Sequence, residues 1–98
     1  MTTHHLRSLF DPASVALIGA SERPGSLGAA LARNVLESGF KGDLFLVNRR
    51  HRRVLEMPAY PRPADLPGVP ELAIIATPAP TVPELLAELG RIGCKVAV

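Results

Sequence analysis

The fold of this 98-residue chain follows from the sequence Val15-Ala16-Leu17-Ile18-Gly19-Ala20-Ser21-Glu22-Arg23-Pro24-Gly25-Ser26-Leu27-Gly28. It begins with a continuous apolar run, residues 15–18, which is typical of a strand buried on both faces of a sheet. The run ends in glycine, crosses a turn-rich loop and meets a helical pattern, for which Ser26 is a good N-cap. In this layout backbone N–H groups and a helix N-terminus can hold a phosphate or pyrophosphate. The sequence therefore predicts that this loop binds a nucleotide-like ligand.

The spacing of the glycines departs from the dinucleotide-binding fingerprint G-x-G-x-x-G. Ala20 and Ser21 follow Gly19, and only Gly25 and Gly28 keep the standard offset. Because these two glycines have no Cβ, a ligand and the neighbouring strand can each approach the backbone. A glycine-rich turn of this kind also occurs without a ligand, so the other loops have to identify what binds.

Length and composition limit the chain to one small domain with an aliphatic core. Hydrophobic residues make up 47% of it, but only three phenylalanines and one tyrosine are aromatic. The net charge of +2 is too small to indicate general nucleic-acid binding, and we expect no nucleic-acid partner. The single Cys94 excludes an internal disulfide and a cysteine zinc cluster. No signal peptide or long apolar segment is evident, so we expect a cytoplasmic protein that is not bound to a membrane.

The pattern along the chain predicts an α/β fold. We expect strands at residues 15–18, 43–47, 71–77 and 95–98, and a proline-rich loop at 57–70 with at most a brief extended piece near Ala59-Tyr60. One helix runs from Ser26 to a stop at Gly39. A second begins at Thr81, which forms a capping box with Glu84, and ends at Gly93. Its apolar stripe consists of Leu85, Leu86, Leu89 and Ile92.

This order of elements, βαβ, a long loop and βαβ, predicts a Rossmann-like doubly wound parallel sheet with helices on both faces. The sheet looks truncated after its fourth strand, since the chain stops inside an apolar strand. We therefore expect residues 1–98 to be the N-terminal fragment of a longer protein. An apolar sheet edge can also associate with a second copy of the chain, so a homo-oligomer is a possible assembly.

Three loops follow strands and are expected at the ligand-binding edge of the sheet: residues 20–28, 48–53 and 77–80. An NAD site has an acidic residue roughly 20 residues past the glycines, at the end of the second strand. Here Asn48, Arg49 and Arg50 stand at that place. Guanidinium groups suit an additional phosphate, which disfavours NAD and leaves NADP and coenzyme A. Arg52 and Arg53 lie farther from the strand end, and the sequence leaves open whether they contact a ligand or are solvated.

The chain resembles the N-terminal CoA-binding domain of NDP-forming acyl-CoA synthetases, which is related to the alpha subunit of succinyl-CoA ligase. The same domain occurs fused to GNAT acetyltransferases. The resemblance covers nearly the whole chain and depends on the order and spacing of its motifs. These are Phe10-Asp11-Pro12, Val15 to Ser21, Pro24-Gly25-Ser26-x-Gly28, Asn34, Gly39-Phe40-x-Gly42, Val47-Asn48, Tyr60, Asp65-Leu66-Pro67 and Pro78-Ala79.

The resemblance implies coenzyme A as the ligand and a role for each of the three loops. The first loop would hold the phosphates of CoA, through Gly19, Ala20, Ser21, Gly25, Ser26, Leu27 and Gly28. The second would lie near the phospho-adenosine end, through Asn48 with Arg49 or Arg50. The third would run along the nucleotide and pantetheine, through Thr77, Pro78, Ala79 and Pro80.

The resemblance also bears on whether the chain is an enzyme. In the synthetases a phosphorylated histidine carries phosphate between sites, but it belongs to a later domain. His4, His5 and His51 do not correspond to it, and we find no catalytic triad, paired carboxylates, metal-ligand spacing or Walker lysine. Alone, the chain is expected to bind CoA or acyl-CoA without catalysis, as part of a parent that interconverts acyl-CoA, NDP and phosphate with acid, CoA and NTP. A regulatory domain of an acetyltransferase and an NADP-binding or nucleotide-sensing domain are the alternatives.

Overall fold

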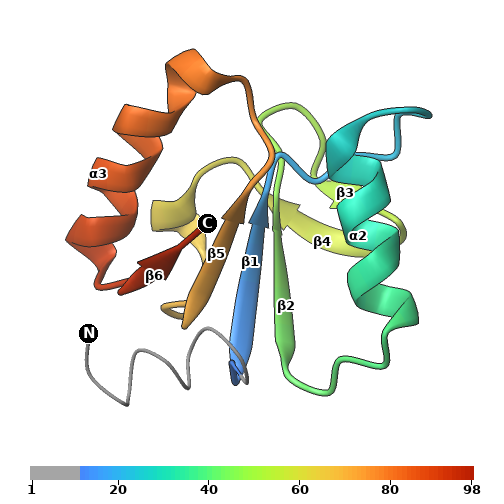
Figure 1. Ribbon diagram of the computed structural model, residues 1–98, viewed down its shortest axis with the longest axis horizontal. Coiled ribbons are helices and arrows are strands. Elements are labelled where there is room, and N and C mark those ends of the chain that lie inside the picture. Colours follow the sequence, from blue (N-terminus) through green and yellow to red (C-terminus); the bar gives the residue numbers. More distant parts are fainter. Residues whose placement is uncertain (1–11) are drawn as a thin grey trace.

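The central strand of the sheet is β1 (Ser14–Ile18), which pairs in parallel with β2 (Asp43–Val47) and β5 (Leu72–Ile75). The computed structural model describes residues 12–98 and contains one six-stranded sheet of order β3-β4-β2-β1-β5-β6 (Figure 1). Phe10 and Asp11 of the family motifs, as well as His4 and His5, lie outside the described residues. The other elements are α2 (Leu27–Glu37), β3 (Arg53–Val54), β4 (Met57–Tyr60), η1 (Pro63–Asp65), η2 (Ala79–Thr81), α3 (Val82–Ile92) and β6 (Val96–Ala97).

The predicted number of strands was wrong, because the sheet has six strands and not four. The segment expected to be a loop, residues 57–70, begins with β4, which includes the brief extended piece that was expected and pairs in parallel with β2. The short β3 lies before this segment and pairs antiparallel with β4. The sheet is therefore mostly parallel. The hairpin was missed because its turn residues, Leu55 and Glu56, have positive φ values of 51° and 63° without being the glycine or asparagine that usually mark such a turn.

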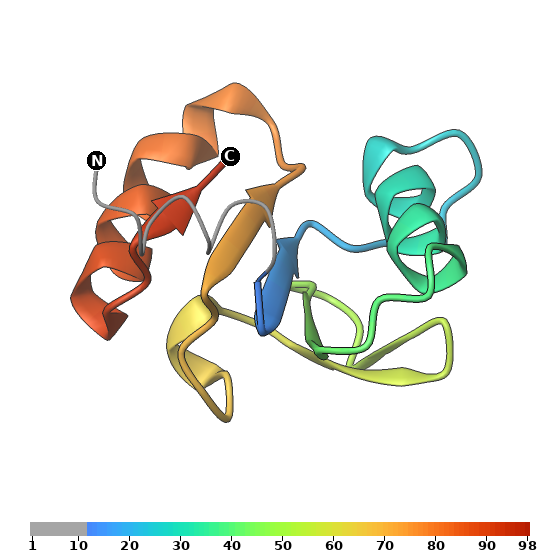
Figure 2. The ribbon, with the colours of Figure 1, turned by 60° about the horizontal axis from the view of Figure 1, so that its bottom comes forward.

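The two helices cover opposite faces of the sheet, as predicted. On one face Leu17 and Leu46 form a buried cluster with Ala32 of α2. The next residues along these strands, Ile18 and Val47, point the other way and pack with Leu89 of α3. Both views show α2 beside β2 and β4 and α3 beside β5 and β6 (Figures 1 and 2). From β1 the chain therefore first builds the sheet outward on the β2 side, and afterwards on the β5 side.

The helix α2 begins and ends where the sequence predicted. The Ser26 hydroxyl accepts a hydrogen bond of 3.1 Å from the Ala29 N–H, which is the N-cap bond. After the C-cap Ser38, Gly39 takes a positive φ of 78°. A Cβ at Gly28 would overlap the carbonyl oxygen of Gly19, so this glycine lets the helix pack directly on the end of β1.

The helix α3 differs from its prediction in two respects. Thr81 has helical backbone angles and no capping bond to the helix; its hydroxyl donates instead to the carbonyl of Pro78 at 2.6 Å. The expected capping box is therefore wrong, because the preceding turn uses the hydroxyl. Leu86 is 46% exposed and lies outside the apolar stripe, whereas Leu89 is buried. Gly93, with a φ of 98°, ends the helix as predicted.

Candidate functional site

A cavity of about 790 Å³, here named the strand-end cavity, lies at the carboxyl ends of the parallel strands. Its floor includes Ile18 and Val47, the last residues of β1 and β2, together with Ala76 directly after β5. Because β1 connects to β2 on one side and lies beside β5 on the other, this is the point where the strand order reverses. Doubly wound folds bind their ligands at this point.

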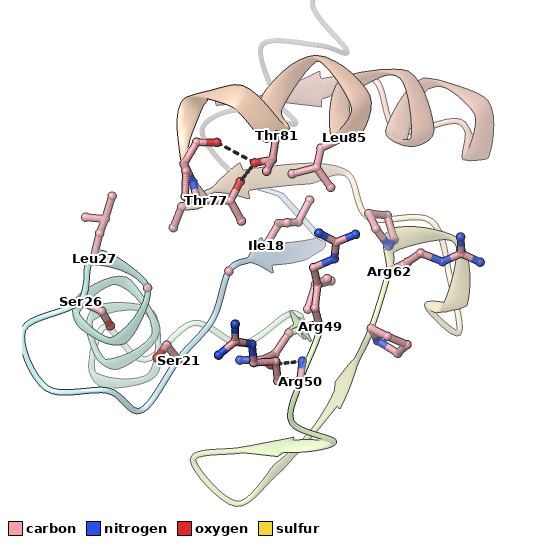
Figure 3. A pocket seen from close by; sticks show the side chains of 18 of the residues that line it. Ile18, Ser21, Ser26, Leu27, Arg49, Arg50, Arg62, Thr77, Thr81 and Leu85 are labelled. Carbon is pink, nitrogen blue, oxygen red and sulfur yellow. Dashed lines mark hydrogen bonds between the residues drawn. The ribbon is translucent and has the colours of Figure 1, made fainter.

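The glycine loop between β1 and α2 forms one wall of the cavity (Figure 3). Its start is held against β2, because the Gly19 N–H donates to the carbonyl of Val47 at 2.9 Å. Its end is held by Ser26, whose hydroxyl donates to the carbonyl of Arg23 at 2.8 Å. Six of the seven residues that the sequence analysis assigned to this loop line the cavity: Gly19, Ser21, Gly25, Ser26, Leu27 and Gly28.

Ala20 does not line the cavity, although the sequence analysis placed it with the phosphate-binding residues. Its side chain is completely buried in the cluster beneath α2. The chain reverses at Gly19, which has a φ of 93°, and this turn directs the next side chain into the core. Ala20 contributes its backbone instead, since its carbonyl oxygen accepts a hydrogen bond of 2.9 Å from the Asn48 amide.

Asn48 connects the glycine loop to the basic loop that follows β2. Its side-chain Nδ2 donates to Ala20, and its Oδ1 accepts hydrogen bonds from the backbone N–H groups of Arg50 at 2.7 Å and His51 at 2.8 Å. Asn48 also lines the cavity, although its side chain forms these hydrogen bonds with backbone groups of the protein. Asn48 thereby sets the conformation of the loop that presents the arginines.

Arg49 and Arg50 both line the cavity and both are exposed. Figure 3 shows their side chains diverging: that of Arg49 extends toward Ile18 and Leu85, and that of Arg50 extends toward Ser21. The basic loop therefore presents one guanidinium to the glycine loop and another to the side of the cavity near α3.

The loop after β5 contributes only its first two predicted residues. Thr77 and Pro78 line the cavity, whereas Ala79 and Pro80 are exposed and do not. The chain enters the 3-10 turn η2 at Ala79 and turns away. A hydrogen bond of 2.8 Å between the hydroxyls of Thr81 and Thr77 joins the two ends of the turn.

The cavity also includes residues that the sequence analysis did not place in the site. One group follows β4, where only a brief extended piece was expected, so the sequence analysis did not place these residues at the ligand-binding edge of the sheet. The other group spaces its members at i, i+3, i+4 and i+7 along the start of α3, and this spacing would have identified the helix face beside the third loop. The additional residues are Arg23, Pro61, Arg62, Pro63, Thr81, Glu84, Leu85 and Glu88.

Charges divide the cavity into two sides. The basic side, at the glycine loop, carries Arg23 and Arg50, whereas the side near α3 carries Glu84 and Glu88 together with the guanidinium of Arg49. Arginine side chains pair well with phosphate oxygens, so a polyanionic ligand would place its phosphates on the basic side and its less charged portion on the other.

Neither a metal-ligand cluster nor a membrane-spanning helix is present in the part of the chain that the structure describes. No group of three or more histidine, cysteine, aspartate or glutamate residues is arranged to hold a metal ion there. None of its helices has the length and apolar character needed to cross a membrane. Cys94 lies outside the strand-end cavity, and burial raises the pKa of its thiol.

Comparison with known proteins identifies the family of the domain. The profile described as the CoA binding domain matches residues 13–98. The chain is 43% identical over 97 residues to an ADP-forming acetate–CoA ligase II from Archaeoglobus fulgidus, covering 99% of this chain and 14% of the ligase. It is 39% identical over 90 residues to a trans-feruloyl-CoA synthase from an unidentified prokaryote, covering 92% of this chain and 13% of that enzyme.

A solved structure supports the same relationship. The fold superposes with a TM-score of 0.91 and 32% identity on a dinucleotide-forming acetyl-coenzyme A synthetase 1 from Ca. Korarchaeum cryptofilum, a structure in complex with phosphate and ADP. The match covers 97% of this chain and 20% of the synthetase. The chain thus spans between about an eighth and a fifth of the length of these relatives.

Proposed function

The chain belongs to the CoA-binding domain family, in the form found in ADP-forming acetyl-CoA synthetases, and on this premise we propose that the strand-end cavity is its coenzyme A site. The observation that carries the proposal is the meeting of three elements in one cavity: the glycine loop, the first turn of α2 and the basic loop. The cavity volume of about 790 Å³ is typical of a cofactor pocket.

The pyrophosphate of CoA is assigned to the glycine loop and the start of α2. The first N–H groups of a helix have no partner within the helix, and they favour negative charge. Here the N–H of Ala29 donates to the Ser26 hydroxyl. The two residues before it in the helix, Leu27 and Gly28, line the cavity. Their N–H groups, with the guanidinium of Arg50 on the opposite wall, provide the donors for a phosphate.

The pantetheine arm is assigned to the side of the cavity near α3. Thr77 and Pro78 of the third loop and Leu85 of α3 form this side together with Ile18. The proline ring and the apolar side chains offer a firm surface, which costs a flexible ligand arm little further ordering. Threonine hydroxyls can donate to the amide carbonyls of such an arm.

The ligase reaction is the broader part of this proposal. Since the chain covers 14% of the acetate–CoA ligase, we propose that it supplies CoA binding to a longer NDP-forming acyl-CoA synthetase, whose other domains act on the acyl group and the nucleotide. Relatives are named for both acetate and ferulate, so the acyl group is assigned to residues outside this domain.

The test is calorimetric titration of the chain with CoA, NADP and NAD. We expect CoA to bind most tightly, and Arg50→Gln to weaken its binding about tenfold through loss of one charge-assisted contact. Arg52→Gln is the matched control, because this neighbouring arginine is exposed and lines neither the strand-end cavity nor the smaller cavity described below. Tighter binding of NADP than of CoA, or equal effects of the two substitutions, would contradict the proposal.

A further inference from the structure

A second cavity, here named the loop cavity, lies between the glycine loop and the β3 hairpin. Its volume is about 440 Å³, and it is lined by Ser21, Glu22, Arg23, His51, Arg53 and Val54. Ser21 and Arg23 also line the strand-end cavity, so the two cavities are neighbours across the glycine loop. The family motifs include Ser21 but none of the other residues that line it.

The residues of the loop cavity combine basic side chains with a fixed framework. Val54 is buried and forms the apolar base. The Arg23 N–H donates to the Ser21 hydroxyl at 2.9 Å, and the His51 N–H donates to the Asn48 side chain at 2.8 Å. The basic groups thus project from backbone segments that hydrogen bonds already hold in place.

The charge of the loop cavity is positive. Arg23, His51 and Arg53 provide two guanidinium groups and an imidazole, and Glu22 is the acidic residue among the lining residues. Within residues 12–98 none of the three basic side chains forms an ion pair. Arg53 uses its Nη2 atom to donate to the carbonyl of Glu56 at 2.7 Å, which orients the guanidinium and leaves its other nitrogen atoms for a ligand.

We propose that the loop cavity binds a phosphate dianion, as a phosphomonoester or as free inorganic phosphate, with Arg23, His51 and Arg53 as the donors. This proposal rests on the proposed function of the strand-end cavity. If the pyrophosphate of the coenzyme lies on the glycine loop, the loop cavity is directly on the other side of the residues that line both cavities, Ser21 and Arg23. Guanidinium groups match phosphate oxygens in geometry, and imidazole can donate from a ring nitrogen. The phosphate can be the ribose phosphate of CoA itself, or a separate ion bound beside the coenzyme.

The experiment compares the wild-type chain with Arg53→Gln and His51→Gln, with Arg52→Gln as the control. Calorimetric titrations in phosphate-free buffer use CoA and dephospho-CoA, and a third series titrates inorganic phosphate alone. Dephospho-CoA lacks the phosphomonoester, so its binding tests the strand-end cavity independently of the loop cavity. Thermal unfolding verifies that each exposed substitution leaves the fold intact.

Either source of the phosphate gives a distinct result. If the coenzyme supplies it, Arg53→Gln and His51→Gln weaken CoA about tenfold and leave dephospho-CoA unchanged. If the ion is separate, the same variants weaken inorganic phosphate about tenfold and leave both coenzymes unchanged. The proposal is overturned if both variants behave like Arg52→Gln with all three ligands. Failure of dephospho-CoA and CoA to bind the wild-type chain would instead overturn the proposed function.

Discussion

The Asn48 side chain donates a hydrogen bond of 2.9 Å to the carbonyl oxygen of Ala20, across 28 residues of sequence. This bond joins the loop after β1 to the loop after β2 at the edge of the sheet where both strands end. Through its Oδ1 the same side chain accepts from the backbone of Arg50 and His51. One amide group therefore aligns the glycine loop with the basic loop, and the geometry of the strand-end cavity depends on it.

Asn48→Ala is expected to lower the free energy of unfolding by about 1–3 kcal/mol, since it leaves partly buried backbone groups without their partner. Asn48→Asp is also expected to be destabilising, because its carboxylate still accepts from Arg50 and His51 but sets an oxygen in place of the donor against the Ala20 carbonyl oxygen. Urea unfolding of both variants measures the difference. An unchanged free energy of unfolding in both variants would show that the bond to Ala20 contributes nothing to stability.

Gly28→Ala is expected to destabilise the domain by about 1–3 kcal/mol or more, because the added Cβ would overlap the Gly19 carbonyl oxygen. The matched control is Gly90→Ala in α3, where a Cβ would meet nothing within 4 Å. Alanine favours a helix over glycine, so this control should raise the free energy of unfolding by about 0.5–1 kcal/mol. Thermal unfolding of the two single variants therefore should give shifts of opposite sign.

The sequence was sufficient to predict the elements whose signals are local. The apolar strands, the Ser26 cap and the glycine at position 93 each follow from a few adjacent residues, and the structure confirms them. Membership of the cavity was harder to predict, because it depends on where side chains point. Ala20 belongs to the predicted loop but its methyl group is buried beneath α2. Arg62 lines the cavity because it follows β4, which the sequence indicated only as a brief extended piece.

The hairpin between β3 and β4 contains strain that a single substitution can relieve. Glu56 has a φ of 63°, a conformation that costs a residue with a Cβ roughly 1–2 kcal/mol. Glu56→Gly is expected to raise the free energy of unfolding by at most about 1 kcal/mol. The gain is limited because glycine also increases the conformational entropy of the unfolded chain. Glu56→Ala removes the same side chain and keeps the Cβ, so it should give no such gain. Chemical denaturation of the pair separates the backbone effect from loss of the carboxylate.

Cys94 gives the domain a dependence on alkaline pH. The thiol is half-buried, and its pKa lies above the ordinary value because burial disfavours the thiolate. The hydrogen bond to the carbonyl of Val96 lowers the pKa, but by less than burial raises it. The unfolded chain therefore releases this proton at lower pH than the folded domain does, so the contribution of Cys94 to stability is complete below about pH 8.5 and declines as the pH rises above it.

The alkaline decline is measured by urea unfolding between pH 7 and pH 10, comparing the wild-type chain with Cys94→Ala. We expect the wild type to lose more of its free energy of unfolding over this range than the variant does, because alanine has no proton to release. The alanine variant should be less stable at neutral pH through lost packing beside Leu89 and Ile92, so the slope with pH is the quantity to compare and not the absolute stability. Parallel curves for the two proteins would show that burial of this thiol does not couple to folding.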